Sequence, residues 1–145
     1  MNRTKTLAKN TTVLLISQIS VYLFTFFTNL YLARYLGVEG FGIISFALAL
    51  TGIFSIFIDL GLNTLTIREV ARNKSKANDY ISNIVAIRLL LSTLTFITIY
   101  LVVYLLGYNT ITSYVIYFLT FYIMINSFCQ LFYSIFQANE KMEYQ

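Results

Sequence analysis

The chain has 145 residues, of which 58% are hydrophobic and 11% are charged, and its formal net charge is +4. Long apolar runs with so few charges are typical of a protein that spans a membrane several times, and they exclude an ordinary soluble core. The chain has one cysteine, Cys129, and no histidine, which excludes an internal disulfide and the common zinc sites. We therefore expect an all-α integral membrane protein without a metal site or a cofactor.

The first predicted elements are a basic cytoplasmic N-terminus at residues 1–10 and a transmembrane helix at 11–36. The uncharged run that forms this helix is longer than the core of a signal peptide, which has about 7 to 15 residues. Gly37, Gly40 and Gly42 then predict a short turn, because glycine adopts backbone angles that other residues avoid. A second transmembrane helix is predicted at 41–65.

The chain becomes basic after the second span, and we expect residues 66–80 to form an amphipathic helical segment at the cytoplasmic membrane surface. Asn78 or Asp79 can cap the next helix, which we place at 81–106. A turn at 107–110 separates it from a fourth span at 113–136. Residues 137–145 begin a cytoplasmic loop in which the chain stops, so we expect an N-terminal portion of a longer protein.

The basic residues set the orientation, because lysine and arginine near helix ends are retained on the cytoplasmic side. If the N-terminus is cytoplasmic, every basic residue except Arg34 lies at or near the inner face. We therefore expect a multi-pass protein of the cell membrane with its N-terminus inside. The basic middle segment has few charges and no nucleic-acid reader motif, so no nucleic acid is expected as a partner.

Small and polar residues recur at helical spacing within each span, which places them on one face of each helix. Such stripes pack helices closely and form hydrogen bonds between them, and this accounts for most of the serines and threonines. Amides and charges are costlier to bury, so a hydrated pathway is the second interpretation of a smaller set. That set consists of Asn29, Asp59, Arg88, Asn126 and Gln130.

Two charged residues admit further interpretations. Asp59 and Arg88 can pair across neighbouring helices near the inner face, in which case their role is structural. Arg34 can extend to the interface as a lipid-facing residue, or it can capture an anion at the outer mouth of a pathway. The sequence leaves these alternatives open.

Four blocks of sequence resemble a known family. They are R-Y-L-G-V-E-G-F-G at Arg34–Gly42, D-L-G-L-N-T with I-R-E-V-A-R within Asp59–Arg72, R-L-L-L-S from Arg88, and Q-A-N-E-K-M at Gln137–Met142. They resemble the oligosaccharide and polysaccharide flippases of the superfamily of multidrug, oligosaccharidyl-lipid and polysaccharide exporters. The resemblance covers nearly the whole chain.

The resemblance implies a bundle of twelve to fourteen helices in two pseudo-symmetric halves that opens alternately to the two sides of the membrane. It implies a polyprenyl-pyrophosphate-linked glycan as the transported partner, besides membrane lipid. The four predicted spans would then need the remaining helices of the transporter, or other copies of the chain. Arg34 and Arg88 would contact the head group, with Asn29, Asn126 and Gln130 also binding the substrate. Asp59 and Arg68 would each have a role in coupling or in an ion pair.

Two other functions remain open. An oligomeric exporter of cationic drugs would use Asp59 as its cation site, and a non-transporting membrane scaffold would have no hydrated stripe. An enzyme is not expected, because the sequence shows neither a nucleophile paired with a base nor a glycine loop for phosphates.

Overall fold

The computed structural model describes the backbone of residues 3–73 and 77–139, and all regular structure in these ranges is helical. The helices are α1 (Arg3–Asp59), α2 (Leu62–Arg72), α3 (Ala77–Leu106) and α4 (Thr110–Ala138). The all-α prediction is therefore confirmed for the described residues. Lys74, Lys76 and the predicted loop beyond Asn139 lie outside them.

Three stretches of the described chain are long and apolar enough to cross a membrane: Thr11–Arg72, Ala77–Leu106 and Thr110–Ala138. The first has 62 residues, which at about 1.5 Å per residue far exceeds a hydrocarbon core of about 30 Å. It therefore cannot cross the bilayer as one straight helix.

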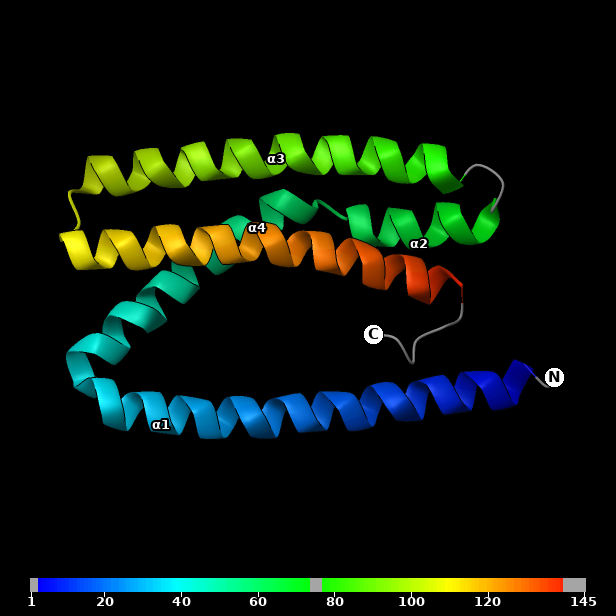
Figure 1. Cartoon of the computed structure of the whole chain (residues 1–145), viewed down its shortest axis with the longest axis horizontal. Helices are drawn as coiled ribbons and strands as arrows, with labels where there is room; N and C mark the ends of the chain where they lie inside the picture. The colour runs from blue at the N-terminus through cyan, green and yellow to red at the C-terminus, as the bar shows by residue number, and fades with distance from the viewer. Residues whose placement is uncertain (1–2, 74–76, 140–145) are drawn as a thin grey trace.

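Gly37 divides α1 into two arms, and the second arm turns back and runs away from the first at an angle (Figure 1). Its backbone angles, φ 67° and ψ −174°, are non-helical and lie in a region that essentially only glycine occupies. We call residues 3–36 the first arm and residues 38–59 the second arm. Gly40 and Gly42, which the sequence also placed in the turn, remain within the helix of the second arm.

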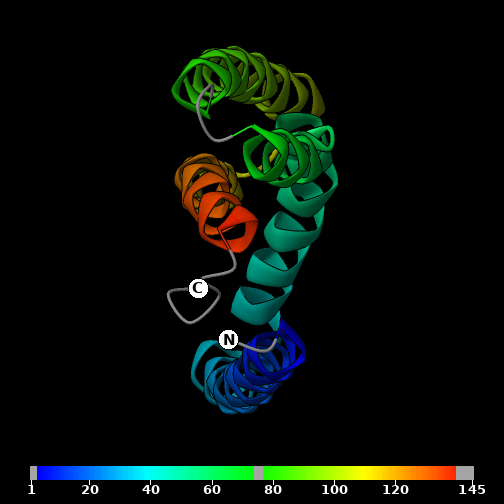
Figure 2. The same ribbon diagram turned by 90° about the vertical axis from the view of Figure 1, so that its right-hand side faces the viewer.

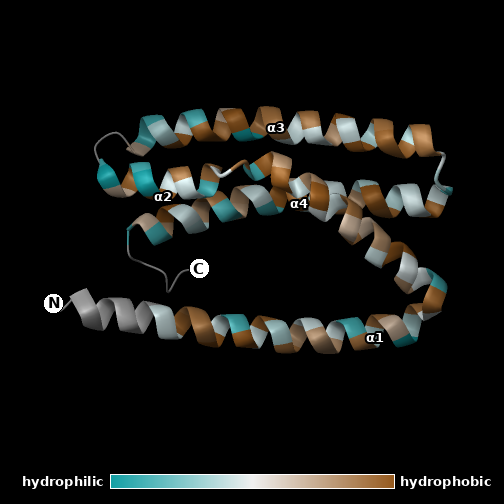
Figure 3. Cartoon of the chain, turned by 180° about the vertical axis from the view of Figure 1, so that it is seen from behind, coloured by the Kyte–Doolittle hydropathy of each residue, from teal (hydrophilic) through white to brown (hydrophobic). Residues whose placement is uncertain are grey.

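The second arm, α2, α3 and α4 form the packed part of the molecule (Figures 1 and 2). One apolar cluster joins Ala47 of the second arm to Ile99 and Val103 of α3 and Ile116 of α4. Large apolar side chains remain exposed along all the long helices, and hydrophilic colour is concentrated in α2 (Figure 3). An apolar exterior over a small core is the expected form of a protein whose solvent is lipid.

The first arm lies apart from this bundle (Figure 2). Every side chain from Leu15 to Tyr31 is exposed, including the predicted polar stripe of this helix. Polar stripes on all the predicted spans were expected to face one another. Within the described chain, the stripe of the first arm does not meet the others. The reversal at Gly37 directs that arm away from α3 and α4.

The predicted span at 41–65 is interrupted, because α1 ends at Asp59 and α2 begins at Leu62. Leu60 and Gly61 both have positive φ, 40° and 82°. A bulky residue such as leucine rarely adopts this conformation, which costs on the order of 1–2 kcal/mol. We call Leu60–Gly61 the α1–α2 break.

The helix α2 packs within the bundle, and it includes residues 66–72 of the segment predicted for the membrane surface, a location that stays a prediction. Leu62 of α2 forms an apolar cluster with Ile84 of α3 and Leu131 of α4, and Val70 is also buried. The exposed side of α2 carries Arg68, as the amphipathic pattern predicted. Its apolar face is thus covered by protein.

We predict that Gly37→Ala opens or disorders the reversal between the two arms, because a Cβ strains this conformation by about 1–3 kcal/mol. Nothing lies within 4 Å of that Cβ, so the effect arises from backbone conformation and not from a collision. Spin labels at Tyr22→Cys and Leu48→Cys, in a Cys129→Ser background, should report a broadened distance distribution. Gly42→Ala is the control, since its Cβ also meets open space but its backbone is helical. An unchanged distribution in the Gly37 variant would refute this assignment.

Candidate functional site: a buried arginine beside a polar pocket

Arg88 lies near the middle of the packed bundle, on the inner face of α3. Its side chain has no exposed surface, although it carries a full charge. On the same face of α3, Ser92 and Thr95 are also buried, as their spacing of three and four residues predicts. A charge buried this completely requires a counter-charge and hydrogen-bond acceptors.

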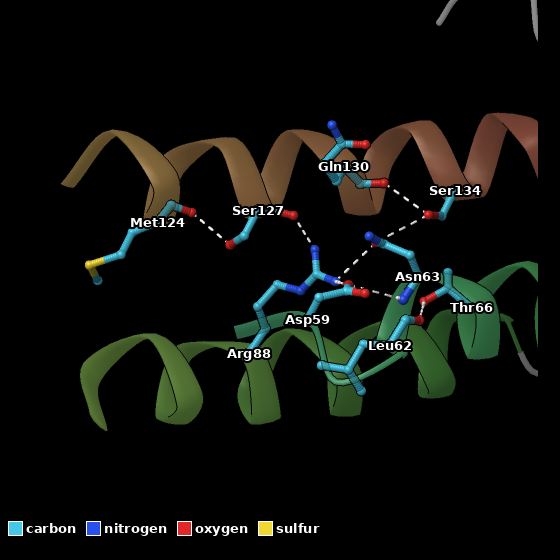
Figure 4. A network of polar contacts seen from close by, with 9 residues as sticks. All are labelled: Asp59, Leu62, Asn63, Thr66, Arg88, Met124, Ser127, Gln130 and Ser134. Atoms are coloured by element: carbon cyan, nitrogen blue, oxygen red, sulfur yellow. Dashed lines mark hydrogen bonds and ion pairs between the residues drawn. The ribbon is translucent and has the colours of Figure 1, made fainter. Parts of the chain in front are cut away.

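The guanidinium group finds these acceptors on three other segments (Figure 4). Nη2 lies 3.0 Å from Asp59 Oδ1 at the end of α1 and 3.0 Å from Asn63 Oδ1 in α2. Nη1 donates to the backbone carbonyl of Ser127 in α4. One side chain of α3 therefore holds together the end of α1, the start of α2 and the middle of α4.

These contacts also bridge the α1–α2 break. Asp59 precedes the break and Asn63 follows it, and Arg88 Nη2 donates to both. The Asn63 N–H lies 3.4 Å from Asp59 Oδ1, and Ser134 Oγ of α4 donates to Asn63 Oδ1 at 3.2 Å. We call Asp59, Asn63, Arg88, the Ser127 carbonyl and Ser134 the arginine cluster. It fixes the relative positions of two helices that the backbone no longer joins regularly.

The two charges of the arginine cluster have different surroundings. The Arg88 side chain is fully buried, whereas 40% of the Asp59 side chain is exposed. Their charges cancel, which reduces the cost of keeping either one inside a membrane span. The carboxylate is therefore the ionised group of this pair that a ligand can reach.

A cavity of about 250 Å³ opens beside the arginine cluster, between the α1–α2 junction and α4. Most of its lining residues have a polar side-chain group, although apolar atoms form most of its surface, and the lining comes from two segments that are far apart in the sequence. The lining residues are Ser55, Ile58, Asp59, Asn63, Tyr122, Ile123, Asn126, Ser127 and Gln130. We call this cavity the polar pocket.

The polar pocket collects part of the residue set proposed from the sequence. Asp59, Asn126 and Gln130 line it, and Arg88 lies behind Asp59. The Asp59–Arg88 contact has the geometry of an ion pair, one of the interpretations that the sequence left open. A role in transport for these residues stays a prediction.

The other proposed residues lie elsewhere. Asn29 and Arg34 are exposed on the first arm of α1, outside the pocket lining. Arg68 is exposed on α2, with Nε 4.0 Å from a carboxylate oxygen of Glu69. The structure therefore does not bring these three residues to the polar pocket.

Asn63, Ser127 and Ser134 were not in the proposed site set. A signal for Asn63 was present, because it follows Asp59 by four residues and shares its helical face. The Ser127 contact uses a backbone carbonyl, which every residue possesses, so side-chain patterns could not reveal it.

Buried threonines in the bundle bond mainly within their own helices. Thr51, Thr66 and Thr120 each donate to the carbonyl four residues earlier, at 2.7 to 2.8 Å. Such bonds satisfy a hydroxyl without a partner on another helix. These residues thus act as small packing residues, and the polar contacts between helices are concentrated in the arginine cluster.

We predict that Arg88→Met destabilises the protein by about 3 kcal/mol, because it leaves Asp59 and Asn63 without their shared donor. The figure is the lower end of the range for breaking a buried pair, since Asp59 remains partly hydrated. The measurement is the midpoint of unfolding by sodium dodecyl sulfate in mixed micelles, followed by circular dichroism.

Arg68→Met is the matched control, because its side chain is 75% exposed and should change stability by less than about 0.5 kcal/mol. The double variant Arg88→Met/Asp59→Asn should recover part of the loss, since it removes both charges of the pair. Equal effects of Arg88→Met and Arg68→Met would contradict a structural role for the arginine cluster.

Comparison with known proteins gives one match. The family of polysaccharide biosynthesis proteins matches residues 7–145, which include every element of the described fold except the first residues of α1. Neither the curated proteins nor the solved structures give a significant match. Because the match covers nearly the whole sequence, including the arginine cluster and the polar pocket, the chain belongs to the polysaccharide biosynthesis protein family.

Proposed function

We propose that this chain forms part of a flippase that moves lipid-linked oligosaccharide or polysaccharide units across the cytoplasmic membrane by alternating access. Family membership links the chain to polysaccharide biosynthesis, and the apolar helices link it to a membrane. The observation that carries the proposal is the polar pocket, which lies between helices that otherwise expose apolar side chains. A hydrophilic cavity within such helices is the feature expected along a route for hydrophilic cargo.

The proposed topology has four crossings with a cytoplasmic N-terminus. The reversal at Gly37 divides the longest apolar stretch into two crossings, and α3 and α4 supply the others. The start of α1, the end of α2 and the end of α4 lie at one end of the molecule (Figure 1). This end carries Arg3, Lys5, Lys9, Arg68 and Arg72, which favours its placement on the cytoplasmic side.

Of the two arginines proposed for head-group contact, Arg34 is exposed and Arg88 is buried. Arg34 is exposed near the Gly37 reversal, so its guanidinium can meet a pyrophosphate there. Arg88 donates to three acceptors inside the bundle, and contact with a head group would require it to leave them. We therefore assign head-group contact to Arg34 and a positioning role to Arg88.

The pairing of Asp59 counts against the cation exporter. In that function a cationic drug must meet an unneutralised carboxylate, whereas Asp59 lies 3.0 Å from the guanidinium of Arg88. The polar pocket in turn counts against a scaffold without a hydrated stripe. A glycan flippase is the function that agrees with both features.

The topology is tested with two single cysteines in a Cys129→Ser background. Val38→Cys, beside the Gly37 reversal, should react with an impermeant maleimide applied outside intact cells. Ala71→Cys, near the end of α2, should react only after the membrane is permeabilised. Both side chains are exposed, so a difference in their labelling reports sidedness and not burial. The reverse pattern would place the N-terminus outside.

The transport proposal is tested with the complete reading frame that contains this chain, expressed in cells whose own glycan flippase is deleted. Export of surface glycan should be restored. Arg34→Gln should lower export about tenfold, since a charge-assisted contact to a phosphate is worth roughly 1.5–3 kcal/mol, while Arg34→Lys keeps the charge and should lower it less. Immunoblots of membrane fractions verify equal protein levels. Full export by Arg34→Gln at equal protein level would exclude the head-group role, and no restoration by the unaltered frame would contradict the flippase.

A further inference from the structure

The polar pocket has an unusual balance of charge and hydrogen-bonding groups. Among the residues of the described chain that line it, the only ionisable groups are Asp59 and Tyr122. Asn63, Asn126 and Gln130 add amides, while Ser55 and Ser127 add hydroxyl oxygens whose hydrogens are donated to the carbonyls of Gly52 and Met124. The pocket therefore offers neutral amide donors and several neutral acceptors around a single carboxylate.

Only one of the two carboxylate oxygens of Asp59 is bonded within the arginine cluster. Its Oδ1 accepts from Arg88 Nη2 and from the Asn63 N–H. Within the part of the chain that the structure describes, Oδ2 makes no hydrogen bond, and 40% of the side chain is exposed. A carboxylate oxygen is thus left to accept hydrogen bonds from a ligand in the pocket.

The charges of Asp59 and Arg88 favour an uncharged ligand over a cation or an anion. Arg88 already neutralises Asp59, so a cation in the pocket would have to compete with a buried guanidinium at 3.0 Å. An anion would meet the carboxylate first, because Arg88 lies behind it with no exposed surface. An uncharged ligand meets neither penalty, since its desolvation requires only that its polar groups be matched.

We propose that the polar pocket binds an uncharged, hydroxyl-rich group of about the size of one sugar ring. Asp59 Oδ2 accepts from one hydroxyl, and the amides of Asn126 and Gln130 donate to and accept from others. A cavity of about 250 Å³ is slightly smaller than typical drug-sized pockets, which begin near 300 Å³. This inference rests on the proposed function, in which the pocket contacts the glycan while Arg34 contacts the pyrophosphate.

The structure also supplies a reporter and a matched control for this proposal. Ile123 lines the polar pocket but contributes no polar side-chain atom. Ile125 lies on the same helix and is 51% exposed, outside the pocket lining. Ile123→Cys and Ile125→Cys, each in a Cys129→Ser background, differ mainly in the face of α4 that they occupy.

The experiment measures the rate at which each cysteine reacts with a charged methanethiosulfonate in phosphatidylcholine nanodiscs. The probes are methyl glycosides of glucose, galactose, mannose and N-acetylglucosamine, with tetramethylammonium and inorganic pyrophosphate at equal concentration. We expect at least one glycoside to slow the reaction at position 123. Position 125 is exposed on the apolar exterior, so it should react far more slowly with the charged reagent, and no glycoside should change its rate. The two ions should protect neither position.

Several results would overturn the proposal. An unreactive cysteine at position 123 would show that water does not enter the pocket. Protection by tetramethylammonium alone would indicate a cation site, and protection by pyrophosphate alone would indicate an anion site. Reaction that no glycoside slows would also refute binding of a hydroxyl-rich group.

Two further variants test the residues without breaking the arginine cluster. Asn126→Leu and Gln130→Leu remove amides whose side chains bond neither to Arg88 nor to Asn63. Each should raise the glycoside concentration needed for protection about three- to tenfold, the effect of one lost neutral hydrogen bond. Unchanged protection in both variants would remove these amides from the site.

The two proposals fail in different ways. If the chain binds a glycoside but its complete reading frame restores no glycan export, the flippase proposal fails and the binding site stands. If export is restored and is unaffected by Asn126→Leu and Gln130→Leu, and no glycoside protects position 123, the binding site fails and the flippase stands.

Discussion

The contact between Arg88 and its acceptors is the interaction on which the rest of the bundle depends. A fully buried guanidinium in a membrane span requires a balancing charge and acceptors for its N–H groups. In Arg88 both Nη atoms are bonded, while Nε has no partner among the described residues. Asp59 balances the charge, and the acceptors come from the end of α1, the start of α2 and the middle of α4. Burial of one charge thus requires these segments to meet at one place, and the polar pocket forms beside that place because the partly exposed carboxylate faces it.

Two irregularities of backbone shape the molecule around this contact. Gly37 reverses α1 through angles that exclude other residues, and it leaves the first arm outside the packed bundle. The α1–α2 break lies between Asp59 and Asn63, which both bind Arg88. The first irregularity sets the direction of the first arm, and the second lies between two residues of the pocket lining.

The sequence predicted the parts of this structure that depend on local patterns. Hydropathy and charge identified the all-helical membrane class, and in the structure Gly107 lies between α3 and α4. The spacing of Arg88, Ser92 and Thr95 identified the buried face of α3. Asp59 was placed in the candidate site because a charged residue within an apolar span is costly and therefore needs a partner or water.

Features that depend on three-dimensional context could not be predicted in the same way. Periodicity continues through residues 41–65, so it concealed the break at Leu60–Gly61, where φ is positive and where Arg88 contacts a residue on either side. The exposure of Asn29 and Arg34 follows from the direction that the chain takes after Gly37. A polar stripe identifies one face of a helix, but it does not identify what that face meets.

The α1–α2 break has a consequence for the medium around it. Before the break, the last helical backbone hydrogen bond joins the Leu60 N–H to the Ile56 carbonyl. After it, the first joins the Leu65 N–H to the Gly61 carbonyl. Peptide groups between these points cannot all bond as they do in a continuous helix, and acyl chains offer them no alternative partner. This level of the protein must therefore be shielded from lipid tails by other protein segments or be reached by water.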